Sequence, residues 1–218
     1  MKTFSFLFCL GLSAIALRAD EALTPLKLDY PPPQLTGTPV PAKLKNLEAP
    51  NVKPPLIMVP AGVTNLAKGK PVTASDTAPV IGDVTLITDG DKSSDEGSFV
   101  ELDRGLQWVQ IDLGAPAELY AVALWHYHGQ ARAYLSVIVQ VSNDPAFKTD
   151  VRTIFNNDDD NKSGFGAGRD PTYLEKNTGR LIPAGKAVAR YVRLYSAGNT
   201  SNELNHYIEV EVYGRAKP

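Results

Sequence analysis

The side chains best suited to chemistry gather in one short stretch of the sequence, LWHYHGQAR (residues 124–132). His126 and His128 are two of the three histidines of the chain, and Tyr127 lies between them. Residues two apart on an extended strand share one face, so both imidazoles could bind a single metal ion. The stretch could therefore belong to a zinc site, a catalytic centre or a ligand-binding surface.

The sequence lacks the residues that a zinc site or a hydrolytic site needs. The remaining histidine, His206, would have to be the third ligand that a zinc site requires, and no HExxH pattern is present. Ser136, His126 and Asp112 have the residue types of a hydrolytic triad, but no nucleophile elbow places them together. The residues therefore favour neither zinc nor hydrolysis.

The composition of the chain excludes further classes of function. Cys9 is the only cysteine, so cysteine-based zinc sites and thiol catalysis are excluded from the rest of the chain. The formal net charge is −2, and no basic stripe with interleaved aromatic residues is present. Nucleic-acid binding depends on such a basic surface and is therefore not expected.

Residues 1–19 have the layout of a secretory signal peptide. Lys2 is followed by an apolar run to Leu17, with small residues at positions 14, 16 and 19. The run is shorter than the ~20 residues that span a bilayer, although an anchor that stays attached is the alternative. We expect a protein that is secreted, periplasmic or held at the cell surface.

Residues 20–63 are rich in proline, which removes backbone donors and fixes φ. They show no sustained period of 2 or 3.6, so we expect an extended linker or tether. The short apolar runs at 23–26 and 56–59 leave open that parts of it dock on the folded domain.

Residues 64–215 read as short strands separated by turns. Val109, Ile111 and Leu113 alternate with polar residues, and no ten-residue stretch has a helical period. This pattern predicts an all-β sandwich or barrel, and about 150 residues suffice for one core. The expected strands cover 108–114, 120–125, 135–142, 188–195 and 207–213.

Six segments in order resemble discoidin domains, the coagulation factor five/eight C-type modules of the galactose-binding-like fold. They are NLAKGKPVTAS (65–75), ITDGD (87–91), WVQIDLG (108–114), VIVQVSND (137–144), ARYVRLY (189–195) and YIEVEVYG (207–214). The family includes the family 32 carbohydrate-binding modules. The resemblance implies an antiparallel jelly-roll β-sandwich with ligand loops at one end, which binds sugars, proteins or membranes without catalysis.

The same resemblance implies a structural calcium ion. Calcium takes six to eight oxygen ligands, and the turn at 88–94 offers carboxylates and hydroxyls. The loop is longer here than is usual in the family, and an acidic, solvated turn is the alternative. The ligands implied are Asp89, Asp91, Ser94, Ile208 and Glu209.

A second acidic run, NNDDDN (156–161), does not have the spacing of a calcium loop. Lys162 stands where an oxygen ligand is required, and no Glu follows at the right distance. A loop tip is expected instead, because Asn and Asp favour turns.

A sugar site combines an aromatic plate with polar side chains that bind hydroxyls. We expect Trp125 to be packed in the core, whereas His126 and Arg132 should be exposed near one end of the sandwich. The candidate ligand-binding residues are His126, Tyr127, His128, Arg132, Asn202, Asn205 and His206.

The leading hypothesis is an exported, non-catalytic carbohydrate-binding module with a structural calcium ion and a glycan or polysaccharide partner. The alternative is a discoidin-type protein-interaction or surface-assembly module that binds another surface protein and no sugar. Membrane insertion is disfavoured because no loop carries several consecutive large apolar residues.

Overall fold

The structure is a computed structural model that describes residues 21–35, 43–49 and 51–216. The predicted signal peptide, residues 1–19, lies outside the described residues. Within the described ranges, no helix has the length and apolar character needed to cross a membrane.

Strands make up almost all of the regular structure, and every pairing between named strands is antiparallel. The predicted all-β antiparallel class is thus confirmed. The elements are β1 (Leu23–Pro25), β2 (Met58–Pro60), β3 (Thr64–Asn65), β4 (Val72–Ala74), the 3₁₀ helix η1 (Val84–Thr88), β5 (Val100–Leu102), β6 (Gln107–His126), β7 (Ile138–Ser142), β8 (Arg152–Asn156), β9 (Arg180–Ser196) and β10 (Asn205–Ala216).

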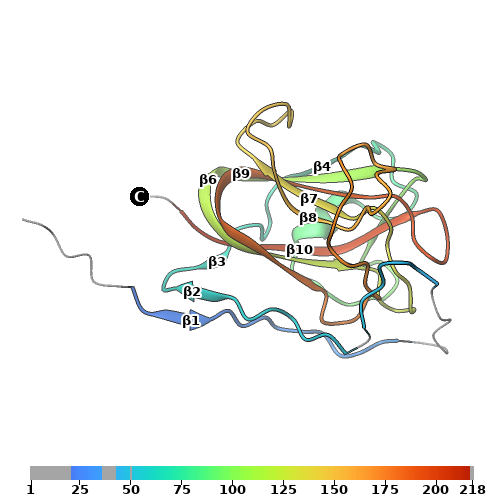
Figure 1. Cartoon of the computed structure of the whole chain (residues 1–218), viewed down its shortest axis with the longest axis horizontal. Coiled ribbons are helices and arrows are strands. Elements are labelled where there is room, and N and C mark those ends of the chain that lie inside the picture. The colour runs from blue at the N-terminus through green and yellow to red at the C-terminus, as the bar shows by residue number, and fades with distance from the viewer. Residues whose placement is uncertain (1–20, 36–42, 50, 217–218) are drawn as a thin grey trace, which may run out of the picture.

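Two long strands, β6 and β9, build both layers of the sandwich because each bends (Figure 1). The first part of β6 pairs with β4, and its second part pairs with β10. The pairing register of β6 with β9 shifts between Asp112 and Ala117, and such irregularities let a strand change sheets. Gly114 lies at this corner with φ +88°, a conformation that other residues rarely adopt.

The second part of β6 is buried on both faces. Val122 and Leu124 belong to the main core between the layers, whereas Ala123 and Trp125 belong to a second cluster on the outer face. This explains an apolar run that does not alternate with polar residues. Trp125 is 0% exposed, as expected from its residue type.

The proline-rich segment covers this outer face. β1 pairs with β2, and Leu26, Leu28 and Ile57 pack against the second cluster. Figure 1 shows both strands running beneath the sandwich. The described part of the segment is extended, but it is docked and does not form a free tether. Its apolar residues shield a sheet face that would otherwise be exposed to water.

Candidate ligand-binding site

A depression of about 220 Å³ at the loop end of the sandwich contains four of the predicted ligand-binding residues. We call it the aromatic depression. Phe99 and Glu101 come from β5 and the residue before it, His206 comes from β10, and the others come from the loops beside β6 and β10. Its lining residues are Phe99, Glu101, Tyr127, Arg132, Asn202 and His206.

Phe99 and Glu101 were missed from the sequence. For Glu101 there was a signal, a single charge between two apolar residues of the buried strand VEL. A carboxylate in such a place needs a partner or a function. Phe99 gave no signal, because an aromatic residue next to a strand is ordinarily core.

Two half-buried aromatic rings form one wall of the depression. The ring centroids of Phe99 and Tyr127 lie 5.1 Å apart in an edge-to-face arrangement. The guanidinium of Arg132 lies 4.8 Å from the Tyr127 centroid, a cation–π distance. Such a wall suits the apolar C–H face of a sugar ring.

His206 and Glu101 form a hydrogen-bonded pair, with His206 Nε2 2.7 Å from Glu101 Oε2. Burial lowers the pKa of His206 to about 3, with help from the positive charge of Arg132. Burial also raises the pKa of Glu101, against the effect of Arg132. His206 is therefore neutral at pH 7 and donates its Nε2 proton to Glu101. Its Nδ1 is left as an acceptor with no partner in the described part of the chain.

Arg132 is only 5% exposed, so the expectation of exposure was wrong. Its Nη2 donates to Gln130 Oε1 at 2.7 Å, while its Nε has no partner among the described residues. A buried cation with unused donors is costly, and a ligand oxygen would offset that cost.

The expectation that His126 would be exposed was also wrong, because β6 continues through it into the core. His126 is 0% exposed, stacks on Tyr134 at 4.1 Å, and has Nδ1 2.7 Å from Glu175 Oε1. His128 is likewise buried, with Nε2 2.9 Å from the Lys92 carbonyl. Neither histidine lines the aromatic depression.

Asn205 is also buried and serves the backbone. Its amide donates to the Asp103 and Gly105 carbonyls, and its Oδ1 accepts from Ser196 Oγ and Gly198 N. These four bonds use the whole amide, so the structure places Asn205 in loop support and away from the depression.

The predicted calcium residues come together only in part. Glu209 is 0% exposed, and its Oε2 accepts from Gly90 N at 3.0 Å, whereas its Oε1 has no partner among the residues described. Burial raises the pKa of Glu209 to about 9, with further effects from Glu211 and Asp89. A buried carboxylate oxygen without a donor, beside an acidic turn, is chemistry that fits a hard cation.

The side chains of Asp91 and Ser94 are already engaged in hydrogen bonds within the protein. Asp91 accepts from Ser93 N and Ser98 Oγ, and Ser94 donates from N and Oγ to Gln34 Oε1. Across the described ranges, no three His, Cys, Asp or Glu side chains are grouped to hold a metal ion. Side-chain ligation would thus depend on Asp89 and Glu209.

No family model and no curated protein matches this chain. Solved structures do. A family 89 glycoside hydrolase from Clostridium perfringens matches with a TM-score of 0.51 and 18% identity, over 70% of this chain and 15% of that one. The family 32 carbohydrate-binding module of AlyQ matches with a TM-score of 0.47 and 22% identity, over 65% and 92% of the two chains. The lectin domain of lectinolysin matches with a TM-score of 0.49 and 22% identity, over 71% and 98%.

The strand topology and the match to part of the hydrolase agree with the resemblance found in the sequence. The chain therefore has an antiparallel β-sandwich fold that it shares with part of the family 89 glycoside hydrolase, in agreement with the fold that the resemblance to discoidin domains implies.

Proposed function

We propose that this protein is a carbohydrate-binding module without catalytic activity, and that the aromatic depression is its glycan site. One observation carries the proposal. The aromatic edge of Phe99 and Tyr127 shares a depression with Arg132 and His206, whose Nε and Nδ1 are buried without a partner among the described residues. An apolar plate beside unused donors and acceptors suits a sugar's C–H face and hydroxyls.

A glycan array probed with the full chain, with calcium and with a chelator, tests the proposal. Retention of no glycan under either condition would contradict it and favour a protein-interaction or surface-assembly module.

The contribution of the aromatic wall is tested by Tyr127→Ala. We expect it to weaken binding of an array hit by tenfold or more in calorimetry, because the ring and its Arg132 contact are lost. Tyr30→Ala is the matched control, since Tyr30 is 44% exposed in the N-terminal segment. Equal affinities for Tyr127→Ala and the unaltered chain, at unchanged melting temperature, would place the site elsewhere.

The proposal includes a structural calcium ion held by Asp89 and Glu209. The unpartnered Glu209 oxygen supports it, because a bound cation would supply the positive charge that an ionised buried carboxylate needs. Participation of Asp91, Ser94 and the backbone of Ile208 stays a prediction. Export through residues 1–19, to the periplasm, the cell surface or the medium, completes the proposal.

A further inference from the structure

The aromatic depression is the first of three that adjoin one another. It shares Asn202 with a second depression of about 320 Å³, and the second shares Leu135 and Ala197 with a third of about 310 Å³. The three depressions lie next to one another and share lining residues, and we call them together the loop-end groove. Each part alone is at or below the lower end of the ~300–1,000 Å³ range of ligand pockets.

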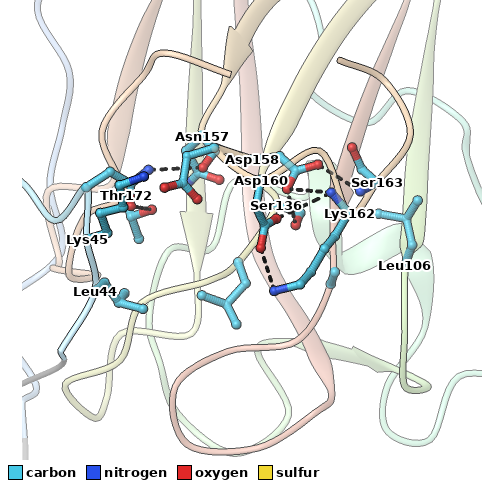
Figure 2. A pocket seen from close by; sticks show the side chains of 14 residues that line it. Leu44, Lys45, Leu106, Ser136, Asn157, Asp158, Asp160, Lys162, Ser163 and Thr172 are labelled. Atoms are coloured by element: carbon cyan, nitrogen blue, oxygen red, sulfur yellow. Dashed lines mark hydrogen bonds and ion pairs between the residues drawn. The ribbon is translucent and has the colours of Figure 1, made fainter. Parts of the chain in front are cut away.

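The far end of the groove combines apolar and polar walls. Figure 2 shows Leu44 and Lys45 on one side, Leu106 on the other, and Asp158 and Asp160 of the acidic loop between them. Leu106 is 39% exposed, so it presents an apolar surface that the protein core does not cover.

This end also carries an unused buried donor. Asn157 is 3% exposed, and its Oδ1 accepts from Val137 N at 2.7 Å. Its Nδ2 has no partner anywhere in the described residues. At the aromatic end, Arg132 Nε and His206 Nδ1 are likewise buried without a partner among the described residues. Both ends of the groove thus hold buried polar groups that a ligand hydroxyl would satisfy.

The walls of the groove are held in place before any ligand arrives. The Asp158 carboxylate accepts from Ser136 Oγ, Lys162 N and Ser163 N, which fixes the acidic loop. In the middle, Asn199 Nδ2 donates to Asn202 Oδ1 at 2.7 Å. Fixed walls reduce the ordering cost of binding, and both carboxylate oxygens of Asp158 already accept hydrogen bonds within the protein.

Charges along the groove nearly balance. Glu101, Glu203, Asp158, Asp159 and Asp160 face four cationic side chains, those of Lys45, Arg104, Arg132 and Lys162. Two of the four cations are paired within the groove, Arg104 with Glu203 at 3.5 Å and Lys162 with Asp160 at 2.5 Å. A polyanionic chain would meet the remaining carboxylates without enough free cations to offset them.

We propose that the loop-end groove binds a glycan chain of three or more sugar units, uncharged or amine-bearing, along its length. The inference rests on the proposed function and extends it from a single sugar to an oligomer. The aromatic depression holds one unit, and the Leu106–Asn157 end holds another at the far side of Asn202.

The test is calorimetry of the full chain with glucose, galactose, N-acetylglucosamine and glucosamine oligomers of one to six units. Oligomannuronate of the same lengths is the anionic counterpart. At least one uncharged or amine-bearing series should bind tenfold or more tightly as a tetramer than as a monomer, and oligomannuronate should bind more weakly than that series.

Leu106→Ala tests whether the tighter binding of the tetramer comes from the far end of the groove. It should weaken tetramer binding about three- to tenfold and leave monomer binding unchanged. Val151→Ala is the matched control, because Val151 is also 39% exposed and lies outside the groove. Asn157→Asp keeps the acceptor for Val137 N but removes the free donor, and should likewise affect only the longer ligands.

The two proposals fail in different ways. The groove is overturned if the monomer binds as tightly as the tetramer, or if Leu106→Ala leaves the affinity for the tetramer unchanged. The single-sugar site stands in both cases. Preferential binding of oligomannuronate overturns the assigned ligand class. Binding of no oligomer by a chain that retains a glycan on the array overturns the groove alone, whereas retention of no glycan on the array overturns the proposed function as well.

Discussion

At the scale of single residues, unpartnered buried atoms point to ligands more sharply than residue types do. His126 and His128 looked the most reactive in the sequence, yet one ring nitrogen of His126 is paired with Glu175 and one of His128 with a backbone carbonyl, and their other ring nitrogens are buried without a partner among the described residues. Glu209 is also completely buried, and its oxygen without a donor in the part of the chain described differs from these nitrogens in lying beside the acidic turn with Asp89. Such an atom costs free energy unless something binds it.

Calcium is expected to stabilise the protein through Glu209. A ligand that binds only the folded state adds about 2.7 kcal/mol to the free energy of unfolding at a hundredfold excess over its Kd. Melting curves with calcium and with a chelator measure this difference, which should disappear in Glu209→Gln. That variant removes the charge but keeps an oxygen to accept from Gly90 N. Identical melting temperatures with calcium and with chelator would mean that the turn binds no calcium ion.

At the scale of elements, the two-sided burial of β6 gives the N-terminal segment a structural role. Its hydrogen bonds reinforce the apolar contacts. Lys92 Nζ donates to the Asp29 carbonyl, Asn177 Nδ2 donates to the Pro31 carbonyl, and Gln34 accepts from Ser94. Proline suits this position because an extended chain lying on a sheet face does not need every backbone donor.

Adjacent residues of this segment should therefore differ in their effect on stability. Ile57 packs against the cluster around Trp125, whereas Leu56 is 76% exposed. Ile57→Ala is expected to lower the free energy of unfolding by about 1–2 kcal/mol, less than at a fully buried site. Leu56→Ala should change it by less than about 0.5 kcal/mol. Urea titrations of both variants measure the contrast, and equal small effects would mean that the segment is undocked in solution.

At the scale of the whole molecule, periodicity was enough to predict an all-β sandwich or barrel, and the resemblance to discoidin domains implied the sandwich. The alternation at Val109, Ile111 and Leu113 places these residues in the core of an antiparallel sheet. Docking of the proline-rich segment could not be deduced, since it depends on an outer face that only the assembled sheet creates. The exposure of Arg132 and His126 was misjudged because burial of a polar side chain depends on partners distant in sequence, such as Glu175.

Export should leave a mature protein without cysteine, because Cys9 lies within the predicted signal peptide. Intact-mass measurement of the protein produced by a secreting host should show cleavage after Ala16 or Ala19. Thiol reagents should then leave that mass unchanged. A mature product that retains residues 1–19 would favour the membrane-anchor alternative instead.

The bend of β6 and β9 also sets the orientation of the molecule. In Figure 1, the loops that line the groove lie at the right-hand end, whereas the first residues of β1 and the last of β10 lie at the left. Anything joined to either end of the described chain is therefore held a full sandwich length from the groove. Under the proposed glycan-binding function, the domain would connect whatever is joined to its ends at one pole with a polymer bound at the other.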